Sequence, residues 1–261
     1  MLLRFLLPAL LLLPLLAVPE AHAARTLDPA YSDLGTLGPE KARGIVIYSH
    51  GRSLSGEDME SPSPRYLSYL AKSGWDVVRF NRPSREDRLD SSSLDLAGRI
   101  RSLKRQGYQQ IVLAGHSFGA FISLMAAARE PGVTAVLAIA PAAYGNYLDS
   151  YDTWQMNASE LYRHLGAVHG TRVLLAFFHG DEYDPGGRGD RSRQMLARNG
   201  VPSIVIDQPK DLVGHVAGSG ELFMTRYGAC IESFIESGAF ACDTGVRTMA
   251  ENPQLNGASD P

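Results

Sequence analysis

Short apolar runs alternate with longer segments of mixed polarity along most of the chain. The apolar runs consist mainly of Val, Ile, Leu, Ala and Phe, and they cover residues 44–50, 75–80, 111–115, 133–141, 172–178 and 202–208. Nearly continuous apolar composition over so few residues is typical of strands that are buried on both faces of a parallel sheet. The pattern therefore predicts one strand in each run.

The segments between these runs have the spacing and end signals of helices. In residues 91–107, serines precede a periodic set of leucines and isoleucine, and Gly107 follows the last of them. Similar patterns predict helices over residues 64–74, 118–130, 159–166, 190–200 and 221–238. Alternation of strands and helices implies right-handed crossovers, and so an α/β fold with a mostly parallel central sheet and helices on both faces.

The first 23 residues differ from the rest of the chain. They have a positive charge at Arg4, an apolar stretch from Phe5 to Val18 and a small-x-small site at Ala21–Ala23. A membrane anchor needs roughly 20 consecutive apolar residues, whereas this stretch is shorter and contains two prolines. We therefore interpret residues 1–23 as a signal peptide that is cleaved after Ala23. The mature chain is expected to be secreted or periplasmic, with no membrane anchor after processing.

The remaining sequence has no repeat, low-complexity tract or linker, so residues 24–261 are predicted to form a single domain. The segments 24–42 and 243–261 are rich in turn residues and are expected to be irregular. A hydrophobic content of 44% and a charged content of 20% are ordinary for a globular protein. A net charge of −3 provides no basic surface for nucleic acid, so no nucleic-acid partner is expected. The oligomeric state stays open.

One short motif indicates chemistry. The sequence "GHSFG" at residues 115–119 places Ser117 between a predicted strand and a helix of small residues. A tight strand-to-helix turn exposes the serine hydroxyl, and the helix N-terminus directs N–H groups toward it. Glycines on both sides would let the two backbones pass closely. The alternative is an ordinary turn in which the serine caps the helix.

A nucleophilic serine needs a base, and the chain has seven histidines. His22 leaves with the signal peptide, and His116 directly precedes Ser117, so the turn should direct its ring away from the hydroxyl. His215 lies in the glycine-flanked loop "DLVGHVAGSG", after the last predicted strand and before the last helix. Such a loop can place an imidazole over the sheet edge, which makes His215 the candidate base.

An acidic loop follows the strand at 172–178 and offers Asp181, Glu182 and Asp184. The order Ser117, aspartate, His215 resembles the α/β-hydrolase superfamily, and the resemblance extends from about Gly44 to Ile235. In that family the acid loop often reads G-x-x-D, from which "GDEYD" departs. Counting back from a helix that starts near Arg191 favours Asp184 over Asp181, with one residue inserted before it. Both aspartates remain candidates.

The resemblance also implies an oxyanion hole and a reaction class. One N–H donor would come from Phe118, and the other from Arg52, in the loop that begins with His50-Gly51. A solvated loop without a catalytic role is the alternative for Arg52. The expected activity is that of a serine hydrolase that cleaves an ester or related acyl bond of a small-molecule substrate. A peptidase, thioesterase or acyltransferase with the same triad, and a non-catalytic binding protein, remain alternatives.

No cofactor or metal ion is expected, because the histidines lack metal-ligand spacing and no G-x-G-x-x-G follows the first strand. Residues 142–171 could hold one or two short helices, too little for a large lid over the site.

Cys230 and Cys242 are the only cysteines. Export would place them in an oxidising compartment, where an even number of cysteines usually pairs. If the last helix ends at Gly238, Cys230 lies about 12 Å from its end, and the following "AFAC" can just return along the helix. We therefore predict a disulfide, with two free thiols as the alternative.

Overall fold

The computed structural model describes residues 24–52, 60–240 and 242. The predicted signal peptide, residues 1–23, lies outside the described residues. No helix within the described ranges is long and apolar enough to cross a membrane.

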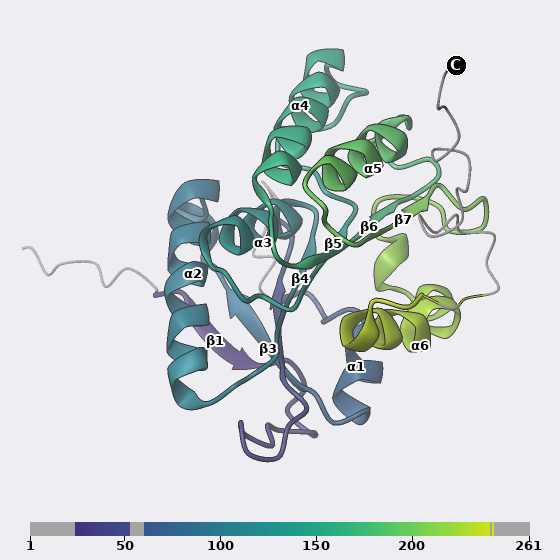
Figure 1. The fold of residues 1–261 in the computed structure, drawn as a ribbon. Coiled ribbons are helices and arrows are strands. Elements are labelled where there is room, and N and C mark those ends of the chain that lie inside the picture. The colour runs from purple at the N-terminus through teal and green to yellow at the C-terminus, as the bar shows by residue number, and fades with distance from the viewer. Residues whose placement is uncertain (1–23, 53–59, 241, 243–261) are drawn as a thin grey trace, which may run out of the picture.

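A seven-stranded sheet with the order β1-β3-β2-β4-β5-β6-β7 forms the centre of the structure (Figure 1). Its strands other than β1 are parallel and correspond to the six predicted apolar runs. They are β2 (Ile45–Ser49), β3 (Asp76–Asn81), β4 (Ile111–His116), β5 (Ala135–Ile139), β6 (Arg172–Phe177) and β7 (Ser203–Asp207). The predicted fold class is confirmed.

The remaining strand, β1 (Thr26–Pro29), pairs antiparallel with β3 at the edge of the sheet. The prediction of irregular structure over residues 24–42 is therefore wrong at this position. The side chains of β1 are mostly exposed, so its sequence has no apolar run. Backbone pairing with the free edge of β3 holds it in place, and this pairing leaves no hydrophobic pattern in the sequence.

Alternate residues along each strand face two different helix layers. On one side lie α2 (Leu89–Gln106), α3 (Phe118–Arg129), α4 (Tyr151–Ala167) and α5 (Arg188–Arg198). On the other side lie α1 (Arg65–Lys72) and α6 (Glu221–Ser237), which pack beside each other (Figure 1). Ile45 and Ile47 of β2 belong to the first core, and Val46 and Tyr48 to the second. The sheet is thus buried on both faces, which explains its uninterrupted apolar strands.

The segment between β5 and β6 contains one helix, α4, which begins eight residues before the predicted start at residue 159. Its first turns are largely exposed at Tyr151 and Met156, so they show no amphipathic period. One side chain fixes this end of α4, because Asn157 accepts the backbone N–H groups of Ala143 at 2.7 Å and Tyr144 at 3.0 Å.

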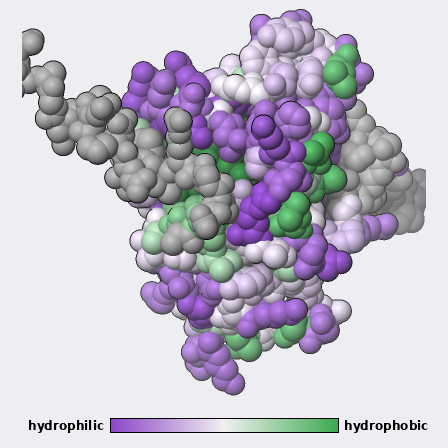
Figure 2. Space-filling model, turned by 90° about the vertical axis from the view of Figure 1, so that its right-hand side faces the viewer, coloured by the Kyte–Doolittle hydropathy of each residue, from purple (hydrophilic) through white to green (hydrophobic). Residues whose placement is uncertain are grey.

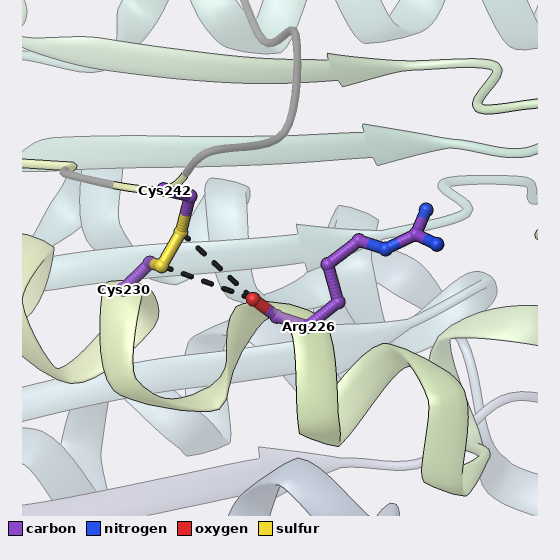
Figure 3. The surroundings of a disulfide bond; sticks show 3 residues. All are labelled: Arg226, Cys230 and Cys242. Atoms are coloured by element: carbon purple, nitrogen blue, oxygen red, sulfur yellow. Dashed lines mark hydrogen bonds between the residues drawn. A yellow bond between two sulfur atoms is a disulfide. The ribbon is translucent and has the colours of Figure 1, made fainter.

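The described C-terminal residues return along α6. Gly238 caps the helix at φ +80°, and the buried ring of Phe240 packs near Tyr227 and Phe234. The predicted disulfide between Cys230 and Cys242 is present, with a Cα–Cα distance of 5.9 Å (Figure 3). A covalent loop of this size stabilises the fold by about 2–3 kcal/mol, mainly through constraint of the unfolded chain.

The side of the molecule shown in Figure 2 is mostly hydrophilic, and its hydrophobic residues form small separate groups. The single sheet supports the assignment of residues 24–261 to one domain, which stays a prediction.

Candidate active site

The candidate catalytic residues follow four strands of the parallel sheet. His50–Arg52 follow β2, Ser117 follows β4, Asp181 comes four residues after β6, and His215 lies in the loop after β7. Because the carboxyl ends of parallel strands meet at one edge of a sheet, all these segments lie along the same edge.

Ser117 occupies a strained turn between β4 and α3. Its φ of 54° and ψ of −118° lie in a region that residues with a side chain rarely adopt. The turn is fixed from outside, because the Ser117 N–H donates to the carbonyl of Ile139 at 2.9 Å. Helix α3 starts at the next residue, so the serine hydroxyl lies at the N-terminus of a buried helix.

The two glycines of "GHSFG" are required by close backbone packing. A Cβ atom at Gly115 would lie 2.3 Å from the carbonyl oxygen of Gly119, and one at Gly119 would lie 2.0 Å from that of Ser49. Both distances are far inside van der Waals contact. A Cβ atom at Gly51 would meet Cβ of Ser117 at 3.5 Å, so the loop after β2 borders the serine.

His215 is paired with a carboxylate. Its Nδ1–H donates to Asp181, with Nδ1 2.9 Å from Oδ1 and 3.0 Å from Oδ2. Both side chains are buried. The proton on Nδ1 leaves Nε2 as the proton-accepting atom, and Nε2 is buried without a hydrogen-bond partner in the described parts of the chain. This is the arrangement that a general base requires.

Backbone hydrogen bonds hold the two loops of this pair together. The His179 N–H donates to Leu212 at 3.2 Å, and the Gly214 N–H donates to His179 at 2.9 Å. The acid loop is closed by the Asp184 N–H, which donates to the Asp181 carbonyl at 3.0 Å. The positions of His215 and Asp181 are thus set by the ends of β6 and β7.

The preference for Asp184 as the carboxylate beside His215 is wrong. Asp184 forms a buried ion pair with Arg188, with 3.0 Å between Oδ2 and Nε. The Arg188 guanidinium also donates to the carbonyl of Pro141 at 2.8 Å and lies 4.9 Å from the ring centre of Phe177. Helix α5 begins at Arg188, three residues before the assumed start near Arg191. The count from that later start therefore placed the acid three residues too late, at Asp184 instead of Asp181.

His116 connects Ser117 to the loop that carries His215. Its Nε2–H donates to the carbonyl of His215 at 3.0 Å, and the two ring centres are 4.9 Å apart. The ring of Tyr183 lies 4.3 Å from His215. Burial lowers the pKa of His116 to about 4, so this ring is neutral at physiological pH. The sequence predicted only that the His116 ring is directed away from the serine hydroxyl; it gave no signal for this contact or for Tyr183.

The two predicted oxyanion donors come from neighbouring segments. Phe118 is the first residue of α3, where N–H groups have no partner within the helix. The guanidinium of Arg52 lies 5.3 Å from the ring centre of Phe118. The loop after β2 and the start of α3 therefore meet beside Ser117. Among the described residues, no group of three or more His, Cys, Asp or Glu side chains could hold a metal ion.

Comparison with known families identifies the family of the chain. The sequence matches the Alpha/beta hydrolase family over residues 46–228, which includes the loop after β2, Ser117, the acid loop and His215. The chain belongs to the alpha/beta hydrolase family. Comparison with curated protein sequences gives no match.

Several solved structures share the alpha/beta hydrolase fold of the chain. An esterase of Pyrococcus furiosus is 17% identical over 77% of this chain and 82% of its own, with a TM-score of 0.55. Dipeptidyl peptidase 4 of Porphyromonas gingivalis is 16% identical over 75% of this chain, with a TM-score of 0.55. An acylaminoacyl peptidase of Pyrococcus horikoshii is 15% identical over 77% of this chain, with a TM-score of 0.53. The chain spans 32% and 38% of these two peptidases.

Proposed function

We propose that the protein is an exported serine hydrolase that cleaves an ester or related acyl bond through a covalent acyl-enzyme. The observation that carries this proposal is the buried pair of His215 and Asp181. It leaves Nε2 of the imidazole as an unpartnered acceptor among the described residues, and the loop of His215 is bonded to His116, the residue before the serine on the strained turn.

In the proposed reaction, His215 Nε2 takes the hydroxyl proton as Ser117 Oγ attacks the substrate carbonyl. Asp181 holds the Nδ1–H tautomer and stabilises the imidazolium that forms. The backbone N–H groups of Phe118 and Arg52 stabilise the oxyanion of the tetrahedral intermediate. The imidazolium then protonates the leaving alcohol, and a water molecule activated by His215 cleaves the acyl-enzyme.

Exposed apolar side chains in the loop of His215 and in the segment that bonds to the acid loop support an ester substrate. Val213 and Val216 flank His215 in the chain and are exposed by 61% and 67%. Leu148 and Tyr151 are also exposed, and the N–H of the neighbouring Tyr147 donates to Glu182 of the acid loop at 3.1 Å. These side chains offer apolar surface for an acyl or alkyl group. Peptidase, thioesterase and acyltransferase activities use the same triad and remain the alternatives.

A substrate panel tests the bond that is cleaved. We expect hydrolysis of p-nitrophenyl esters of increasing acyl length, with much lower activity toward peptide p-nitroanilides and acyl thioesters. The Ser117→Ala variant, assayed beside the wild type, identifies background hydrolysis. Preferential cleavage of peptide anilides would favour a peptidase and contradict the ester assignment. Ligand binding without turnover of any substrate would favour a binding protein.

Export is the second part of the proposal. It rests on the composition of residues 1–23 and is supported by the disulfide between Cys230 and Cys242. Intact mass measurement of the protein from the periplasm or medium should give a chain that begins at Ala24. Recovery of the full-length chain from the cytoplasm alone would contradict it.

A further inference from the structure

Arg82 is a fully buried charge that the proposed reaction does not use. It follows β3 directly, and its side chain is 0% exposed. Its Nη2 donates to the carbonyl of His50 at 2.5 Å and to the carbonyl of Gly51 at 3.3 Å. Both acceptors belong to the loop after β2, which carries the proposed oxyanion donor Arg52.

His50 reinforces the same contacts. The backbone N–H of Arg82 donates to His50 Nε2 at 3.0 Å, which places the ring proton on Nδ1. This Nδ1–H donates to the carbonyl of Gly51 at 2.7 Å. Burial, followed by the nearby charge of Arg82, lowers the pKa of His50 to about 3. The neutral tautomer that holds Gly51 is therefore maintained at physiological pH.

The direction of one carbonyl fixes the direction of the next N–H. In a trans peptide unit, the C=O of one residue and the N–H of the next point to opposite sides of the same plane. The Gly51 carbonyl is held by Arg82 and His50, so the Arg52 N–H points away from both. Gly51 borders Ser117, as the 3.5 Å contact of its added Cβ shows.

Asp87 holds the guanidinium in turn. Its Oδ1 accepts Arg82 Nε at 2.9 Å and the hydroxyl of Ser92 at 2.8 Å. The carboxylate is also buried. A buried ion pair gives little net stability relative to an apolar pair of similar size. The main contribution of this pair is therefore the geometry that it fixes beside the site.

We propose that Arg82 and Asp87 are positioning residues for the oxyanion hole: they fix the peptide unit between Gly51 and Arg52 so that its N–H points toward the developing oxyanion. This inference rests on the proposed function. It assigns no contact between Arg82 and the substrate.

A loss of kcat with little change in KM distinguishes this positioning role from a purely structural one. Loss of one oxyanion donor lowers kcat by about 10²–10³-fold in other hydrolases. Partial misorientation of the Arg52 N–H should lower kcat by roughly 10-fold in Arg82→Lys and roughly 100-fold in Arg82→Met. KM should stay within about threefold, because the interaction is made in the transition state and not in the ground state. Asp87→Asn should give the same kind of change, with a smaller loss of kcat.

The rates are measured with p-nitrophenyl acetate and divided by the concentration of active sites, titrated by stoichiometric fluorophosphonate labelling. Dividing the rate by the concentration of labelled sites corrects kcat for any loss of folded protein. Asp76→Asn is the matched control. Asp76 is buried at the other end of β3 and accepts N–H groups from Leu37 and Gly38. This variant should lose thermal stability and keep the kcat of the wild type per labelled site.

Two results would overturn the positioning role. One is a kcat per labelled site within about threefold of the wild type in Arg82→Lys and in every other Arg82 variant that folds. The other is a raised KM with an unchanged kcat. Arg82→Lys retains the charge beside Asp87, so it decides the question if Arg82→Met does not fold. A wild-type protein that neither hydrolyses the ester nor reacts with the fluorophosphonate would instead contradict the proposed function itself.

Discussion

Replacing Ser117 or His215 by alanine is expected to lower kcat by at least about 10³-fold, because members of a nucleophile–base pair act as a unit. Ser117→Ala removes the attacking oxygen, and His215→Ala removes the atom that accepts its proton. Neither change should unfold the protein. In Ser117→Gly the hydroxyl is also absent, while the positive φ of the turn becomes favourable. This variant should be inactive and at least as stable as Ser117→Ala.

Matched substitutions on neighbouring elements provide the controls. Ser123 is a buried serine of the same helix α3, and His169 is an exposed histidine after α4. Ser123→Ala and His169→Ala should keep kcat within a few-fold of the wild type. Hydrolysis by Ser117→Ala near the wild-type rate, on any substrate that the native protein turns over, would refute the mechanism.

Asp181→Asn is expected to lower kcat by a factor on the order of 10⁴, which is the effect of the corresponding Asp→Asn substitution in a serine protease with a Ser-His-Asp triad. The asparagine amide can donate to His215 Nδ1 and so favours the tautomer with its proton on Nε2, where the base must be unprotonated. The melting temperature should change little, because the side-chain volume is conserved.

Asp184→Asn should show the opposite balance. Its carboxylate faces Arg188 and not His215. Breaking a buried ion pair costs about 3–5 kcal/mol of unfolding free energy, so the melting temperature should fall clearly. The effect on kcat should be less than about tenfold and should arise from a shift of the acid loop. A larger loss of kcat in Asp184→Asn than in Asp181→Asn would show that Asp181 is not the orienting acid.

The central architecture could be predicted from the sequence because burial on both faces leaves a direct trace. Each parallel strand lies between two helix layers, so its residues are apolar without interruption, as in "IVIYS" of β2. The edge strand β1 has no such trace, because it is held to β3 mainly by backbone hydrogen bonds and only Leu27 of β1 packs against the core. The first turns of α4 are exposed, so they also lack a pattern of buried apolar positions.

The candidate site could be predicted as far as the order of chemistry-bearing residues after successive strands. Ser117 and His215 each lie in a turn or loop after a strand, next to glycines, and this setting can be recognised in sequence. The choice between Asp181 and Asp184 depended on where α5 begins. Residues 185–187 gave no signal for a start at Arg188, where the Asp184–Arg188 pair forms across the first turn.

The buried contacts of Arg82 could not be predicted at all. In the sequence, "RPSRED" after β3 reads as a polar surface loop, and charged residues are rarely buried unless they are paired. The pair of Arg82 and Asp87 is local in sequence, but the carbonyls that it holds lie about 30 residues earlier, at His50 and Gly51. Only the three-dimensional packing of β2 beside β3 brings them together.

The proposed mechanism depends on one reactive atom, the Ser117 hydroxyl oxygen. The most direct test of it is mass spectrometry of the protein after reaction with a fluorophosphonate probe. The predicted result is a single adduct per chain, located on Ser117 by peptide sequencing and absent from Ser117→Ala. The rate of labelling should fall strongly in His215→Ala. An unlabelled wild-type protein, or an adduct that persists in Ser117→Ala, would contradict the account.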